Sequence, residues 1–68
     1  MTRVKVNLWD NFDKDGNLTG IEVVWDDTGE FVFEVVWDYR EAQTQENRVE
    51  FRKWVREVVM RYGYEIVV

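Results

Sequence analysis

The side chains that do most of the reactive chemistry in enzymes are missing from this sequence. It has no His, Cys or Ser, whereas 14 of its 68 residues are Asp or Glu. Thiol, serine and imidazole nucleophiles, the usual zinc ligands and a disulfide framework are therefore excluded. Two carboxylate pairs could act as acid and base: Asp13 with Asp15, and Asp26 with Asp27. Both pairs stand in turn sequences with no nucleophile or cofactor motif nearby, so we expect a binding protein and not an enzyme.

Oxygen-bearing side chains follow one another at near-alternate positions in residues 11–22, a spacing that suits a hard cation. The segment reads NFDKDGNLTGIE, and Gly16 allows a sharp turn in its middle. Protein sites for Ca²⁺ hold the ion with several carboxylate and carbonyl oxygens that converge from one loop. The predicted metal ligands are Asn11, Asp13, Asp15, Asn17 and Glu22.

Over these twelve residues the segment resembles an EF-hand loop. The five predicted ligands match its positions one, three, five, seven and twelve in that order, and Gly16 matches the glycine at position six. The resemblance implies a Ca²⁺ site that would help to stabilise the domain. The alternative is a polar hairpin turn, in which Asp, Asn and Gly serve turn geometry, because predicted strands and not helices flank the segment.

Three segments have strand patterns. Residues 3–9 alternate between apolar and polar side chains, and residues 21–25 and 31–37 are rich in Val, Phe and Trp. Between the last two, Gly29 predicts a three-residue hairpin loop in which Asp26 pairs with Glu30. The predicted core face carries Trp25 opposite Phe31, Val23 opposite Phe33 and Ile21 opposite Val35, together with Trp37, Val4, Val6 and Leu8.

From about residue 44 to residue 62 the apolar period becomes helical. Thr44 is the predicted N-cap and Gly63 the residue after the C-cap, while Asp38 with Glu41 offers an alternative start as a capping box. The predicted buried stripe of this helix is Phe51, Trp54, Val55, Val58, Val59 and Tyr62. Residues 64–68 then predict a last strand.

These elements predict a single α+β domain over residues 1–68. It consists of a three-stranded antiparallel meander, one amphipathic helix packed on one face, and a short C-terminal strand. A right-handed return places the last strand parallel to the first, so the expected order is β-β-β-α-β with sheet order 3-2-1-4. No segment has the apolar length of a membrane span or a signal peptide, and we expect a cytoplasmic protein.

Charge is distributed unevenly along the chain. Residues 10–38 hold nine acidic side chains and one Lys, whereas the formal net charge of the whole chain is −5. In the predicted sheet, four of these acids (Glu22, Asp26, Glu34 and Asp38) share the face opposite the core with several valines and Trp9, unless Trp9 folds over the sheet edge or beneath the 10–20 loop. The predicted partner-binding residues are Trp9, Glu22, Val24, Asp26, Asp27, Glu30, Val32, Glu34, Val36 and Asp38.

Such a face would attract a basic protein and repel nucleic acid. Its spaced carboxylates could mimic nucleic-acid phosphates and so inhibit a basic, nucleic-acid-handling protein. In size, charge and architecture the chain is similar to phage-encoded host-takeover and anti-defence factors. Two alternatives remain open: a domain stabilised by Ca²⁺ in the 11–22 loop, and a structural homo-oligomer that pairs through the same valine-containing face.

Overall fold

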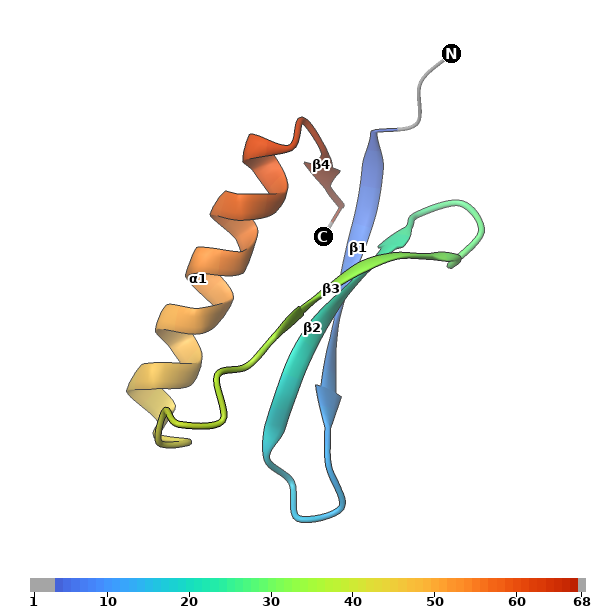
Figure 1. Ribbon diagram of the computed structural model, residues 1–68. Helices are drawn as coiled ribbons and strands as arrows, with labels where there is room; N and C mark the ends of the chain where they lie inside the picture. The colour runs from blue at the N-terminus through green and yellow to red at the C-terminus, as the bar shows by residue number, and fades with distance from the viewer. Residues whose placement is uncertain (1–3, 68) are drawn as a thin grey trace.

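The structure is a computed structural model that describes residues 4–67. Within these residues the elements are β1 (Lys5–Phe12), β2 (Leu18–Trp25), β3 (Phe31–Val36), α1 (Gln45–Arg61) and β4 (Glu65–Ile66). The sheet has the order β3-β2-β1-β4, and β4 pairs parallel with β1 while the other pairs are antiparallel. Helix α1 lies along one face of the sheet (Figure 1). The predicted α+β fold and strand order are confirmed.

The core lies between α1 and the sheet. Its fully buried members are Val6, Ile21, Val23, Val55 and Val59. Aromatic rings close this core near the C-terminus, where Tyr64 packs edge-on against Trp25 with ring centroids 5.6 Å apart. The burial of apolar area in this layer is the main stabilising contribution in a domain of this size.

The predicted helical stripe is too wide. Val55 and Val59 are buried, but Trp54 is 50% exposed. Tyr62 is also exposed, because it is the C-cap residue beyond the last helical turn. On the sheet side Val4 is exposed, since it lies before the first residue of β1. For these three residues the expectation of burial is wrong.

Local hydrogen bonds fix both ends of α1. The Thr44 hydroxyl accepts from the Asn47 backbone N–H at 3.1 Å, so Thr44 is the N-cap as predicted. The alternative start at Asp38 is wrong, because no helical residue precedes Gln45 in the described chain. At the other end Gly63 has a φ of +88°, and the backbone N–H of Tyr64 donates to the Val59 carbonyl. This arrangement is a Schellman motif.

The first hairpin is longer than its sequence pattern indicated. The polar stretch 10–20 was expected to interrupt the sheet, but β1 continues to Phe12 and β2 begins at Leu18. A register shift between Asn11 and Phe12 accompanies the extension. Leu18 is fully buried, although the pattern placed it in a loop.

The second hairpin contains a bulge that the expected register lacked. Val23 faces Phe33 and Ile21 faces Val35, as predicted, and Gly29 has a φ of +76°. Between Val23 and Val24 the register shifts, so that Phe31 pairs with Val24 and not with Trp25. The predicted pairing of Asp26 with Glu30 is replaced by hydrogen bonds of Trp25, which donates to the Glu30 carbonyl and accepts from the Gly29 N–H.

Candidate protein-binding face

The sheet face that points away from α1 is called the open face. Side chains alternate along a strand, so residues next to the core residues Val6 and Val23 belong to this face. The pairing of the strands then brings together residues from β1, β2 and β3. The open face consists of Asn7, Trp9, Asn11, Gly20, Glu22, Val24, Phe31, Glu34 and Val36.

Two carboxylates and a tryptophan form a row across the middle of the open face. Glu22 pairs with Glu34 on one side and with Trp9 on the other. Like charges directly opposite one another in an antiparallel pair are unfavourable. Asn11 offsets part of this repulsion, because its Nδ2 donates to Glu34 Oε2 at 2.8 Å. The row therefore holds two opposed carboxylates, of which Glu34 is oriented by Asn11, and Trp9 is the residue paired with Glu22 on β1.

A second amide from β1 orients another carboxylate at the edge of the open face. Asn7 Nδ2 donates to Asp26 Oδ1 at 3.0 Å. Asp26 begins the loop of residues 26–30, which also carries the exposed side chains of Asp27 and Glu30. The acidic side chains of the β2–β3 hairpin therefore lie at two places, Glu22 and Glu34 in the central row and the other three in the 26–30 loop.

Exposed apolar side chains lie beside these charges. Trp9 is 51%, Phe31 60% and Val36 67% exposed. Trp9 belongs to the open face, but its ring also reaches the 26–30 loop: Cη2 lies 3.9 Å from the position that a Cβ would take on Gly29. Phe31 was expected in the core, and the bulge places it opposite an open-face residue instead. The exposure of Phe31 on the open face follows from the bulge, and no pattern in the sequence distinguishes this residue from a core phenylalanine.

Two valines assigned to the binding surface do not contribute to it. Val24 belongs to the open face, but it is only 1% exposed. Val32 is half-buried and packs against the core cluster, because the bulge turns it towards α1. The expectation that these two side chains lie exposed on this face is therefore wrong, whereas Phe31 and the predicted Val36 are exposed there.

Asp38, the last predicted contact residue, is engaged within the chain. It follows β3, and its two carboxylate oxygens accept from Nε and Nη2 of Arg40, both at 3.0 Å. This side-chain interaction with Arg40 lowers the pKa of Asp38 below its ordinary value. Asp38 therefore stays ionised, but its charge is partly balanced.

The predicted Ca²⁺ ligands are not brought together. Asp13 Oδ1 accepts from the backbone N–H groups of Asp15 and Asn17, each at 2.9 Å, so this carboxylate closes its own turn. Asn11 is engaged with Glu34, and Glu22 lies in the middle of β2 opposite Trp9. Within residues 4–67 no group of three or more acidic side chains is close enough to hold a metal ion. The geometry matches the alternative, a polar hairpin turn.

The backbone hydrogen bonds from Asn17, followed by those from Asp15 and Gly16 and the side-chain amide of Asn17, hold the pKa of Asp13 below its ordinary value. A carboxylate that accepts several hydrogen bonds is stabilised in its charged form. Asp13 therefore has a structural role that needs no metal.

Comparison with known proteins adds no function to this geometry. The chain matches no protein-family model, no curated protein sequence and no solved structure. In the part of the chain that is described, no helix has both the length and the apolar character needed to cross a membrane.

Proposed function

We propose that this protein is a protein-binding module that uses its open face to hold a basic surface of a partner protein. The observation that carries the proposal is the central row, in which Glu22 and Glu34 face each other beside Trp9. Two opposed carboxylates are a cost to the free protein, and a Lys or Arg between them would relieve it. An exposed Trp is also a favoured anchor at protein interfaces.

The partner that suits this surface is a nucleic-acid-handling protein. Surfaces that bind nucleic acid carry Lys and Arg side chains spaced to meet phosphates. Carboxylates fixed on a sheet can take the place of those phosphates, and apolar neighbours such as Phe31 and Val36 exclude water around them. The protein would then act as an inhibitor that competes with nucleic acid.

The test measures binding to a purified linker histone as a basic probe, with duplex DNA as competitor. Wild-type protein should bind the probe, and DNA should displace it. Replacing both Glu22→Gln and Glu34→Gln should weaken binding at least tenfold. The matched control replaces Glu46→Gln and Glu57→Gln, which are exposed on α1, and should change the affinity less than twofold.

Equal weakening by both double variants would mean that only net charge matters, and it would refute the proposal. Sedimentation of the protein alone should give a monomer. A stable dimer that dissociates when Val36→Asp is introduced would instead assign the open face to contacts between copies of this chain.

A further inference from the structure

We infer that a cleft between the end of β3 and α1 binds the arginine side chain of a basic partner segment. The cleft has a volume of about 440 Å³ and is lined by residues of β3, α1 and the segment between them. It goes beyond the open face, with which it shares only Val36. Its size lies within the range of roughly 300–1,000 Å³ that is usual for small-ligand sites.

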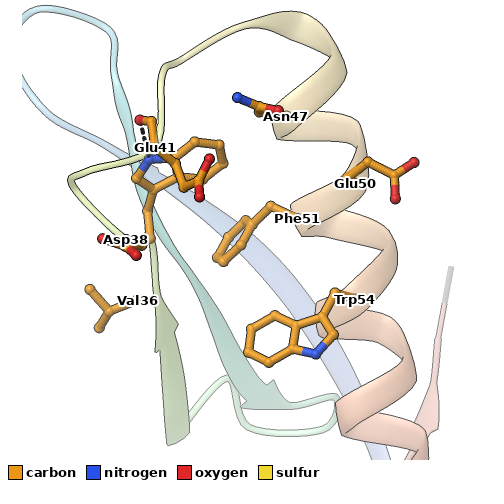
Figure 2. Close-up of a pocket in the computed structure, with 8 residues that line it drawn as sticks. Val36, Asp38, Glu41, Asn47, Glu50, Phe51 and Trp54 are labelled. Atoms are coloured by element: carbon orange, nitrogen blue, oxygen red, sulfur yellow. Dashed lines mark hydrogen bonds between the residues drawn. The ribbon is translucent and has the colours of Figure 1, made fainter.

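Three aromatic rings form a continuous series in the cleft. Trp37 meets Phe51 edge-on with centroids 5.0 Å apart, and Phe51 is followed by Trp54 at 6.3 Å. Trp37 is held in one orientation, because it is buried and its Nε1 donates to the backbone carbonyl of Glu41 at 3.2 Å. Trp54 is half exposed, and Figure 2 shows Phe51 and Trp54 extending from α1 towards the β3 side. The cleft therefore offers aromatic surface that is already ordered.

Three carboxylates line the cleft, and one of them, Glu41, lies beside the rings. Glu41 lies above Phe51, Asp38 stands on the strand side, and Glu50 stands at the outer edge of α1 (Figure 2). Among the described residues that line the cleft there is no Lys or Arg. No ion pair within residues 4–67 engages Glu41 or Glu50. Because Arg40 balances Asp38, the net negative charge of the cleft comes from Glu41 and, at its outer edge, Glu50, and it complements a cation.

This combination favours a guanidinium over other groups. A planar guanidinium stacks on aromatic faces and donates several hydrogen bonds in its own plane, which suits a carboxylate beside the rings. An ammonium group is more strongly hydrated and loses more on entering such a cleft. A neutral apolar side chain would cover the carboxylates without pairing them.

Arg40 is an exposed residue that pairs with Asp38 at the edge of the cleft. It binds Asp38 through two parallel hydrogen bonds of 3.0 Å, the bidentate geometry typical of arginine recognition. This internal pair occupies Asp38, and Arg40 also attracts Glu41 electrostatically without forming an ion pair with it, so Glu41 is the carboxylate that remains beside the aromatic series for a ligand from outside.

The test is an NMR titration of the whole chain with a nine-residue Gly/Arg peptide, a peptide with citrulline in place of Arg, and one with Lys. The Arg peptide should shift the indole N–H signal of Trp54 with an affinity at least fivefold above that of the Lys peptide. The citrulline peptide has a similar shape without the charge and should cause no shift. Equal binding of the citrulline or the Lys peptide would refute the inference.

Matched variants locate the site. Trp54→Leu and Glu41→Gln should each lower the affinity for the Arg peptide at least fivefold, since both side chains are accessible and their loss leaves the core intact. Glu57→Gln removes the same charge from α1 outside the cleft and should change the affinity less than twofold.

The same titration separates this inference from the proposed function. The Glu22→Gln/Glu34→Gln variant should keep the Trp54 shift and the affinity for the Arg peptide, even though its affinity for the basic protein probe falls at least tenfold. If that variant loses the peptide instead, the peptide binds the open face and the cleft assignment is wrong.

Discussion

Gln43 makes two hydrogen bonds with the backbone of Leu18, which lies 25 residues earlier in the chain. Gln43 Nε2 donates to the Leu18 carbonyl and Gln43 Oε1 accepts from the Leu18 N–H, both at 2.9 Å. The side-chain amide thus pairs with the first residue of β2 as a neighbouring strand would. It fastens the segment between β3 and α1, which forms one wall of the aromatic cleft, to the sheet.

Gln43→Ala should therefore destabilise the protein. Both partner groups on Leu18 would lose their hydrogen bonds in a part-buried position, at a cost of about 1–3 kcal/mol. Urea denaturation measures the change, and Gln45→Ala is the control because Gln45 is exposed at the start of α1. A Gln43→Ala variant as stable as the control would show that the two hydrogen bonds between Gln43 and Leu18 contribute nothing to stability.

Val24 and Val36 both belong to the open face, yet truncating Val24 should lower stability, whereas truncating Val36 should lower binding. Val24→Ala removes a side chain that is almost fully buried and should cost about 2–3 kcal/mol of unfolding free energy. Val36→Ala removes an exposed side chain and should change stability by less than about 0.5 kcal/mol while weakening binding of the basic probe. Thermal melts and the binding assay together check this division. A stable Val24→Ala variant would mean that the open face is not packed as described.

The sequence predicts the elements of this fold well, because hydrophobic period and capping residues are local signals. Thr44 and Gly63 mark the helix ends correctly, and the odd-numbered residues Ile21 and Val23 mark the core face of β2. These signals suffice for the topology, since a chain that passes through one helix after a three-stranded meander has few ways to add its last strand to the sheet.

The surface was harder to predict because it depends on non-local geometry. One extra residue at the bulge exchanges Phe31 and Val32 between the two faces, and alternation along the chain carries no sign of it. The hydrogen bonds from Gln43 to Leu18 and the cleft near Trp54 each bring together segments that are distant in sequence. A pattern within one segment therefore cannot reveal them.

Gly20 lies where the sheet leaves no room for a side chain. A Cβ at this position would stand 2.9 Å from the Val35 carbonyl oxygen and 2.8 Å from Glu34 Oε2. Gly20→Ala should therefore cost about 1–3 kcal/mol, as overpacking usually does. The carboxylate of Glu34 can move and the backbone carbonyl cannot, so Glu34→Ala should rescue only part of the loss. Full rescue in the double variant, measured by urea denaturation, would contradict the backbone contact.

Asp13 should make stability depend on pH in the acid range. Its pKa is below the ordinary value of 3.8 in the folded protein, so its contribution is complete well above pH 3.8 and is lost as pH falls through the folded value. Asp13→Asn should be less stable than wild type at pH 7, and the difference should shrink below about pH 4. The control is Asp15→Asn, which removes a charge from the same turn but not the carboxylate that accepts its N–H groups. A stability difference for Asp13→Asn that is unchanged from pH 7 to pH 2 would contradict this role.

The resemblance of residues 11–22 to a calcium loop leads to a direct measurement on the folded protein. We expect thermal melts with EDTA, with millimolar Mg²⁺ and with millimolar Ca²⁺ to superimpose, because Asp13 is engaged in its own turn and Glu22 lies across the sheet from Trp9. A ligand at 100 times its Kd that binds only the folded state adds roughly 2.7 kcal/mol. In a domain of this size that corresponds to a rise in Tm of about ten degrees or more. A rise of this size with Ca²⁺ alone, abolished by Asp13→Ala, would show that the turn opens and that Glu22 leaves its pairing with Glu34 to bind the ion.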